Sequence, residues 1–449
     1  MENYSDRLSK AIVIAGIILT LISTPLFAQE CPELIWPGDY EIQNMEDLIA
    51  LSGYTEVSGV LTIHYTDLTR LVGLECLTSV SDLYIQNNEF LQSMEGINNL
   101  IPFNGLHIQN NDNLTSLEGL NHINRIGESL SIVDNDSLTN LKGLNNLTFV
   151  GYLSIGDNNS LTSLKDLNNL TEVYGLVIGN NDYLKSLKGL KNLMISDEYL
   201  SISGNDSLVS LKGLKNIPGT RFLTIRDNDS LINLKGLNNL YGATYTWIQH
   251  NDSLITLKGL ENFTGGGMLV ISDNDSLKSL NGLKNLYSLH LNMEISNNES
   301  LTSLEGLKNI SYVDWLSISD NDSLTSLNGL KNLTQLSVME ISGNDSLASL
   351  EGLENIIYIH SLSISDNDSL TNLKGLEYIT SLPELSIYGN DSFTSLKGLE
   401  NLMEIRSRLS IYENIELCTS IADDFLNQVL DAMYPESPNE LRIYDNKDC

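Results

Sequence analysis

The chain has 449 residues, and 41% of them are hydrophobic, which is enough to build a large core and excludes a wholly disordered protein. The 25 Lys and Arg residues are outnumbered by 58 Asp and Glu, so the formal net charge is −33. A surface this acidic repels nucleic acids and anionic membranes, and we therefore expect no nucleic-acid partner.

Residues 1–28 have the pattern of a secretory signal peptide. Arg7 and Lys10 precede an apolar run over residues 11–22, and the small Ala28 is followed by polar residues. The run is shorter than the ~20 apolar residues that span a bilayer. We expect cleavage after Ala28 and a secreted or cell-surface protein without a transmembrane segment in the mature chain. An uncleaved membrane anchor is the alternative.

Residues 29–60 are expected to cap the first repeat, with a short strand at Tyr40–Ile42 and a helix over Met45–Leu51. Stacked repeats leave apolar surface and strand edges open at their ends, so a cap is required.

A unit of about 23 residues recurs over residues 61–417. Aligned copies begin at sixteen positions: 61, 83, 106, 130, 153, 176, 200, 223, 246, 269, 293, 316, 339, 362, 385 and 409. A repeat of this length is typical of a solenoid, in which each unit packs only on its neighbours.

The copy that begins at Leu130 shows how one unit folds. Leu130 and Ile132 are two residues apart and point to the same side of a short strand. Leucines then follow at every third position from Leu138 to Leu147, too tight for a sustained α-helix but suited to a coil that turns corners. We predict parallel strands stacked around interior columns of Leu and Ile.

An Asn follows the strand in almost every unit: Asn88, Asn111, Asn135, Asn158, Asn181, Asn205, Asn228 and so on to Asn414. We predict that these side chains point inward and bond to backbone groups at the corner, including those of the next rung. A ladder of ligand-binding residues is the alternative.

The pattern Val150-x-x-Leu153-x-Ile155-x-x-Asn158-x-x-Leu161 is close to the leucine-rich-repeat pattern, with one extra residue after the Asn. With its recurring NDSL continuation it resembles the receptor L domain, in the long form of exported bacterial proteins. This resemblance implies a mainly β, right-handed parallel β-solenoid with about sixteen rungs of 23 residues. It also implies adhesion or partner recognition at a solenoid face. Signalling is not implied, because no furin-like cysteine-rich region, membrane span or kinase follows.

Residues 418–449 are similar to the C-terminal cap of the bacterial members. A short amphipathic cap helix that ends at Pro435 is predicted from four apolar residues spaced four apart: Ile421, Phe425, Val429 and Met433. Leu441–Ile443 would add a final strand. A partner-binding helix is the competing interpretation.

Four cysteines flank the repeats, two at each end: Cys31, Cys76, Cys418 and Cys449. Their positions favour the disulfides Cys31–Cys76 and Cys418–Cys449 among three possible pairings. No His or second Cys stands at ligand spacing, so we expect neither a metal site nor a cofactor.

The repeat is barely interrupted, and no catalytic motif interrupts it. The six histidines occupy different phases of the unit, and the glycine run Gly265–Gly267, placed between rungs, has no lysine after it. We therefore expect no enzyme.

Asp136 and its equivalents are expected to stack as solvated carboxylates in the turns. Their mutual repulsion would be reduced in part by recurring lysines: Lys142, Lys165, Lys188, Lys212, Lys235 and Lys258. A chain of Ca²⁺ ions is the alternative.

The exposed strand face is the best candidate binding surface. Its two outward columns are mostly serine in the middle and late rungs: Ser201, Ser203, Ser317, Ser319, Ser363 and Ser365. Two places differ and form the candidate sites. The N-terminal cluster comprises Tyr84, Gln86, His107 and Gln109, with His64 one rung earlier, and the central cluster comprises Arg226, Trp247 and Gln249.

We therefore predict an exported, non-enzymatic recognition or adhesion protein that binds a protein or glycan through its strand face. A structural or surface-shielding acidic rod without a specific ligand is the main alternative. Ice binding through the serine columns is a third, weakened by the acidic turns and by Ser in place of Thr.

Overall fold

The computed structural model describes residues 31–101, 103–430 and 440–449. The predicted signal peptide over 1–28 lies outside the described residues. All nineteen strands of the described residues belong to one parallel sheet. Sixteen strands, one per repeat, make up its body: β3 (Glu56–His64), β4 (Ser79–Gln86), β5 (Gly105–Gln109), β6 (Arg125–Val133), β7 (Phe149–Gly156), β8 (Glu172–Gly179), β9 (Met194–Ser203), β10 (Gly219–Arg226), β11 (Gly242–Gln249), β12 (Gly265–Ser272), β13 (Ser288–Ser296), β14 (Tyr312–Ser319), β15 (Gln335–Ser342), β16 (Tyr358–Ser365), β17 (Glu384–Tyr388) and β18 (Arg408–Tyr412).

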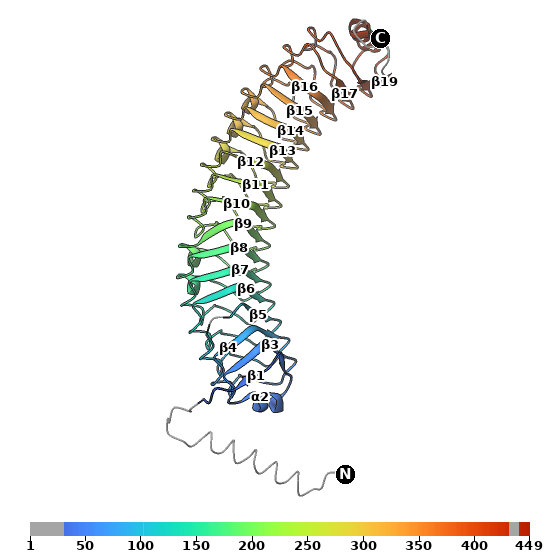
Figure 1. Ribbon diagram of the computed structural model, residues 1–449. Helices are drawn as coiled ribbons and strands as arrows, with labels where there is room; N and C mark the ends of the chain where they lie inside the picture. The colour runs from blue at the N-terminus through green and yellow to red at the C-terminus, as the bar shows by residue number, and fades with distance from the viewer. Residues whose placement is uncertain (1–30, 102, 431–439) are drawn as a thin grey trace, which may run out of the picture.

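The register between strands follows the repeat without a slip at the inward positions. Leu61 pairs with Leu83, Leu130 pairs with Leu153, and the series continues to Leu409. The predicted parallel β-solenoid of about sixteen rungs is confirmed. The rungs stack into a long arc, with β1 near one tip and β19 near the other (Figure 1).

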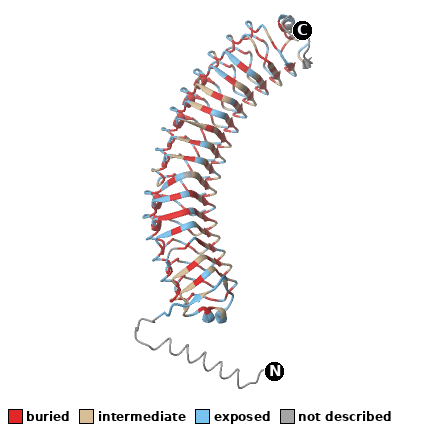
Figure 2. Ribbon diagram, in the orientation of Figure 1, coloured by how far each residue is buried: buried red, intermediate tan, exposed pale blue. Residues whose placement is uncertain are grey.

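The interior is a set of leucine and isoleucine columns, and buried positions recur in every rung (Figure 2). In the rung of Leu130, every inward Leu and Ile up to Leu147 is fully buried. Each such side chain contributes about 1.5–3 kcal/mol of burial free energy. In five rungs the leucine segment closes into a single 3₁₀ turn, because three residues per turn match the leucine spacing: η1 (Lys165–Leu167), η2 (Lys188–Leu190), η3 (Asn281–Leu283), η4 (Glu305–Leu307) and η5 (Asn328–Leu330).

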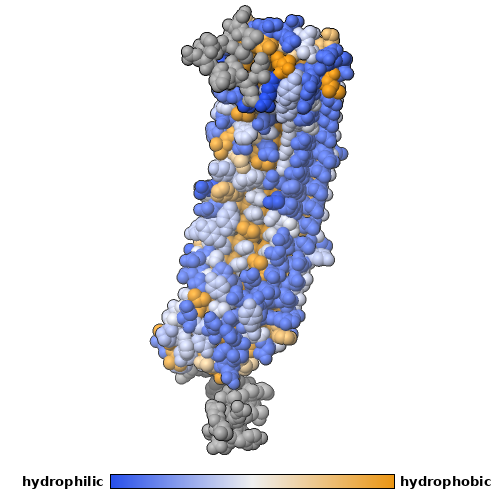
Figure 3. All heavy atoms as spheres, turned by 90° about the vertical axis from the view of Figure 1, so that its right-hand side faces the viewer, coloured by the Kyte–Doolittle hydropathy of each residue, from blue (hydrophilic) through white to orange (hydrophobic). Residues whose placement is uncertain are grey.

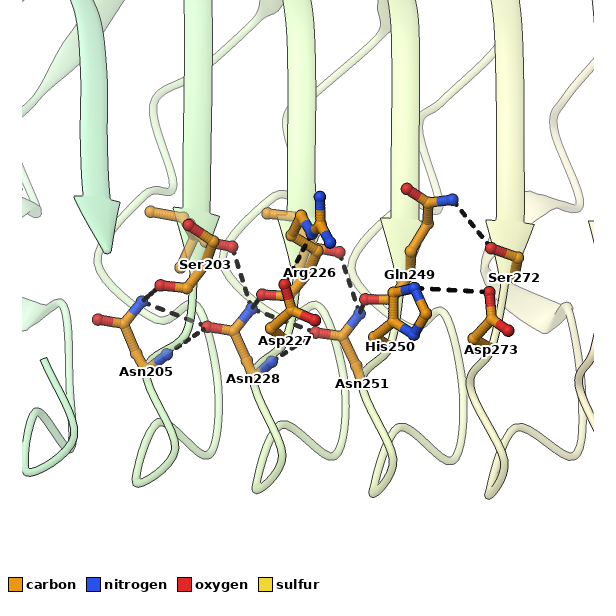
Figure 4. A network of polar contacts seen from close by, with 12 residues as sticks. Ser203, Asn205, Arg226, Asp227, Asn228, Gln249, His250, Asn251, Ser272 and Asp273 are labelled. Atoms are coloured by element: carbon orange, nitrogen blue, oxygen red, sulfur yellow. Dashed lines mark hydrogen bonds and ion pairs between the residues drawn. The ribbon is translucent and has the colours of Figure 1, made fainter. Parts of the chain in front are cut away.

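Buried asparagines tie the rungs together at the corner after each strand (Figure 4). The Nδ2 atom of Asn228 lies 2.8 Å from the carbonyl oxygen of Arg226 and 3.0 Å from that of Ile202 in the preceding rung. Its Oδ1 atom accepts a bond of 3.2 Å from the backbone N–H of Asn205. The same pattern runs from Asn88 to Asn414, and every one of these side chains is fully buried. The prediction that they satisfy corner backbone groups is confirmed, and full burial leaves them no surface to offer a ligand.

The N-terminal cap has the strand and helix that the sequence predicts. Strands β1 (Ile35–Trp36) and β2 (Tyr40–Ile42) pair with β3. Helix α2 (Met45–Leu51) buries Leu48 and Leu51, and Asn44 Oδ1 caps its first turn by accepting from the backbone N–H of Glu46.

The C-terminal cap consists of helix α3 (Thr419–Leu430) and strand β19 (Glu440–Tyr444), which pairs with β18. Phe425 and Val429 are buried as predicted, but Ile421 is 37% exposed, and Ala422 takes the buried place in the first turn. The prediction for Ile421 is wrong because the helix is rotated so that 422, 425 and 429 face the last rung. Met433 and Pro435 lie outside the described residues.

The disulfides Cys31–Cys76 and Cys418–Cys449 are both present, as predicted. In the described part of the chain, neither helix has the length and apolar character needed to cross a bilayer.

One rung carries a polar residue in the inward leucine column. Thr246 pairs with Leu223 and Leu269 and is fully buried, and its hydroxyl has no hydrogen-bond partner. An unsatisfied buried hydroxyl costs about 1–3 kcal/mol.

Replacing Thr246 with Val removes this hydroxyl at nearly constant volume, so the free energy of unfolding should rise by about 1 kcal/mol or more. Urea denaturation of the Thr246→Val variant measures the change. Thr224→Val, at a half-buried outward position one rung away, is the control and should change stability by less than half as much. A lower denaturation midpoint for Thr246→Val would contradict this interpretation of the rung.

The Asn ladder gives a second prediction. Asn228→Ala removes the partners of two carbonyl groups and one N–H group, so it should lower the free energy of unfolding by about 3 kcal/mol or more. The matched control is Asn239→Ala, which removes one bond of an exposed side chain to the Lys215 carbonyl and should cost under about 1 kcal/mol. Equal losses for the two variants, measured by urea denaturation, would show that the ladder has no special role.

Candidate functional site

Three columns of side chains, rather than two, face outward from each strand. In β10 they are represented by Phe222, which precedes the inward Leu223, by Thr224, and by Arg226. We call them the first, second and third outward columns. Because the strands pair in register, each column continues with one residue per rung along the whole sheet.

The four residues of the predicted N-terminal cluster lie side by side on β4 and β5. Tyr84 pairs with His107 in the second column, and Gln86 pairs with Gln109 in the third. The rings of Tyr84 and His107 are stacked, with centroids 4.4 Å apart and planes 9° apart. Burial lowers the pKa of His107, against a smaller opposing effect of Asp82, so the imidazole is uncharged at neutral pH.

His64 lies one rung earlier in the third column, in register with Gln86, as predicted. Its Nε2 atom is 3.2 Å from Gln43 Nε2 and 3.4 Å from the carboxylate of Glu41. The cluster therefore extends into the N-terminal cap, which sequence analysis treated only as a structural element.

The central cluster is also assembled, but its polar groups are already bonded within the chain (Figure 4). Arg226 and Gln249 are neighbours in the third column. The Arg226 guanidinium lies 2.7 Å from the carboxylate of Asp227, and Gln249 Nε2 donates to Ser272 Oγ over 2.9 Å. Trp247, in the second column, is half-buried.

Trp247 belongs to a larger feature that sequence analysis missed. Its ring is parallel to that of Tyr245 at 6.0 Å, and Tyr245 in turn stacks on Phe222 at 5.3 Å. Large apolar residues continue along the first column in other rungs: Tyr152, Tyr199, Met268 and Trp315. We call this set, with Phe222, Tyr245 and Trp247, the aromatic strip.

Figure 3 shows one face of the solenoid, on which apolar and neutral residues form a broken band between hydrophilic edges. Tyr199 stacks on Tyr152 across Gly175, two rungs apart, and a Cβ at Gly175 would lie 2.5 Å from the Tyr199 ring. All members of the strip except Trp247 stand directly before the first inward residue of their unit, which is Thr246 after Tyr245 and a leucine elsewhere. This recurrence could have revealed the strip in the sequence, but the predicted binding surface comprised only the second and third outward columns.

A shallow hollow of about 740 Å³ borders the strip on the flank of β10–β13. Its floor includes Gly242, Gly265 and Gly266. The predicted position of the Gly265–Gly267 run between rungs is wrong, because these residues form the start of β12. A Cβ at Gly266 would lie 2.1 Å from the Ala243 carbonyl oxygen, so close packing between rungs requires glycine there.

The serine columns are less exposed than predicted. Ser201, Ser203, Ser317, Ser319 and Ser363 are half-buried, and Ser365 is only 3% exposed. In-register strands about 4.8 Å apart cover small side chains with their neighbours. The regular hydroxyl surface that ice binding would need is therefore largely covered.

Carboxylates line the turn edge beside the Asn ladder. Burial, and then neighbouring carboxylates of adjacent rungs, raise the pKa of Asp134, Asp206 and Asp345. No ion pair within the described ranges joins Lys142, Lys165, Lys188, Lys212, Lys235 or Lys258 to a carboxylate. Lys374, at the same position of a later unit, lies 3.2 Å from the carboxylate of Glu351, so partial compensation by the lysines stays a prediction. Among those same residues, no three His, Cys, Asp or Glu side chains gather as a metal ion would require.

Comparison with known proteins gives the following. No family model matches the chain, and no curated protein matches it. A leucine-rich-repeat protein from Leptospira interrogans is 20% identical with a TM-score of 0.39, covering 82% of this chain and 93% of its own. A leucine-rich-repeat protein from Bacteroides eggerthii is 14% identical with a TM-score of 0.37, covering 95% and 72%. The functional domain of InlJ from Listeria monocytogenes, which includes a cysteine ladder, is 15% identical with a TM-score of 0.28, covering 82% and 75%.

These identities and TM-scores assign neither a family nor a ligand. The resemblance to the receptor L domain therefore stays a prediction. What the chain binds has to be argued from its own surface.

The stacked carboxylates give a prediction about pH. A carboxyl group whose pKa is higher in the folded state than in the unfolded state favours folding when protonated and opposes it when ionised. Asp206→Asn should therefore raise the free energy of unfolding at neutral pH, and the difference from wild type should shrink at about pH 3.5, where both states are largely protonated. Urea denaturation at the two pH values measures this. Asp423→Asn on the exposed face of α3 is the control, and a pH-independent effect of Asp206→Asn would refute the explanation.

Proposed function

We propose that the protein is exported and acts by binding a protein partner through the aromatic strip, without catalysis. The observation that carries the proposal is the parallel stack of Phe222, Tyr245 and Trp247, half-exposed on one face of a rigid sheet. Aromatic side chains and Arg dominate the binding energy of protein interfaces. Export is supported by the signal-peptide pattern of residues 1–28 and by two disulfides, which persist in oxidising compartments.

The surroundings of the stack suit a protein partner. Stacked rings hold one another in place, so their side-chain entropy is already lost before binding. Arg226 and Gln249 lie at the edge of the stack with their polar groups bonded to Asp227 and Ser272, so they resemble the polar rim of an interface rather than a pocket that grips a small molecule. The hollow next to the strip gives a protruding side chain room to enter.

The proposal is tested by capture from cell-surface proteins labelled with a membrane-impermeant biotin reagent. Wild type and the double variant Tyr245→Ser/Trp247→Ser are immobilised at equal density. Truncating hot-spot residues costs about 2 kcal/mol or more, which is roughly thirtyfold in affinity, so bands captured by wild type should fade strongly with the variant.

Tyr358→Ser is the matched control, because Tyr358 is 46% exposed on β16 outside the strip, and it should capture as wild type does. Equal capture by wild type and the double variant would refute the strip as the docking surface. Capture of nothing by wild type would favour the acidic rod without a specific ligand.

A further inference from the structure

Tyr84 is partly exposed and has an aromatic neighbour in the second column on one side only. His107 covers the side of its ring toward β5 at a centroid distance of 4.4 Å. Toward β3 its neighbour in the second column is the short side chain of Thr62, and no other ring of the described residues contacts Tyr84. The stack fixes the orientation of the ring, so its free face is held ready to receive a flat ligand.

Two uncommitted amides lie beside that ring. The side chains of Gln86 and Gln109 are adjacent in the third column and form no hydrogen bond within the described residues. Gln249 occupies the same column in the central cluster, but its amide is bonded to Ser272. Each free amide can donate and accept at once, which is what a hydroxyl-rich ligand requires.

The two strands before Tyr84 add a carboxylate, on β2, and a second aromatic ring, directly after β3. Glu41 is 64% exposed at its side chain and bonds to Gln43 and His64. Tyr65 is 71% exposed, and its φ of 53° is the left-handed region that bulky residues avoid. Most other rungs place Asn, Asp or Gly there. A strained backbone that holds an aromatic ring in solvent gains no burial, which points to a role in binding.

The charge of this surface selects among hydroxyl-rich ligands. The outward columns of β2–β5 carry Glu41 and Asp82 but no Lys or Arg, and the imidazole of His107 is uncharged at neutral pH. An anionic sugar would meet two carboxylates without a cation to pair with. A neutral sugar avoids this repulsion, while its weakly positive C–H groups can rest on the negative face of an aromatic ring.

We propose that the N-terminal cluster is a binding site for a neutral oligosaccharide. One sugar unit lies against the ring of Tyr84 on its β3 side, and hydroxyl groups of this unit and of its neighbours along the oligosaccharide bond to the amides of Gln86 and Gln109 and to the Glu41 carboxylate. The site goes beyond the proposed protein docking. The stack of Phe222, Tyr245 and Trp247 begins six strands from Tyr84, about 29 Å at ~4.8 Å per strand, and the nearest member of the strip, Tyr152 on β7, lies two strands beyond Gln109, so the two surfaces share no residue.

The test uses purified sugars as probes and includes no protein partner. Maltohexaose, cellohexaose, mannohexaose and chitohexaose are immobilised beside a heparin oligosaccharide as the anionic arm. Wild type should bind at least one neutral probe and not heparin. Tyr84→Ala should weaken that binding at least tenfold, and Gln109→Ala should weaken it severalfold. Tyr287→Ser, 63% exposed on another face, is the control and should bind as wild type does.

Gln109 is exposed, so its replacement leaves the fold intact and keeps the test decisive if Tyr84→Ala is unstable. Thermal unfolding followed by circular dichroism checks both variants. The proposal is overturned if no neutral probe binds wild type, if heparin alone binds, or if Gln109→Ala and a folded Tyr84→Ala bind as tightly as wild type. The strip variant Tyr245→Ser/Trp247→Ser is assayed only for protein capture, so failure of one proposal is separable from failure of the other.

Discussion

The buried asparagine at the corner of each rung is the interaction on which the rest of the molecule depends. A chain that turns sharply inside a solenoid leaves backbone groups pointing into an apolar interior, where no water can reach them. The amide of Asn228 satisfies such groups in its own rung and in the preceding rung. Because the same bonds join consecutive rungs, they also fix the register of the sheet. This register aligns one residue from each rung into an outward column, so residues that are far apart in the sequence form one binding surface.

Much of the fold could be predicted because inward positions are governed by one strong rule. Leu and Ile at fixed spacing have to face the core, so the strands, the rung number and the pairing of Leu130 with Leu153 follow from the repeat. The cap helix shows where this rule weakens. Ile421 and Ala422 compete for one place against the last rung, and the geometry of the helix rather than hydrophobicity decided for Ala422. The predicted position of the Gly265–Gly267 run between rungs was also wrong, because close contact between the backbones of adjacent rungs requires glycine inside a strand.

The candidate surface was harder to predict, because outward positions obey no single rule. The pairs Tyr84–His107 and Gln86–Gln109 follow from register alone, and the structure brings them together. The hydrogen bonds and ion pairs of the side chains cannot be predicted from the register. Arg226 and Gln249 look equally available in the sequence, yet both are engaged with neighbours of their own chain. The stack of Tyr245 on Phe222 was missed because each strand was predicted to begin at its first inward residue, and Phe222 and Tyr245 stand one position earlier.

Contact only between adjacent rungs has a consequence for how this surface can evolve. Duplication or loss of one whole unit between β5 and β10 replaces one rung interface by an equivalent one and leaves both ends unchanged. Each such event would shift the region around His107 relative to that around Phe222 by one strand spacing, about 4.8 Å, while the chemistry of each region stays the same. Recombination among near-identical units can therefore change the distance between the two candidate binding regions in fixed steps of one strand spacing, and selection can act on that distance.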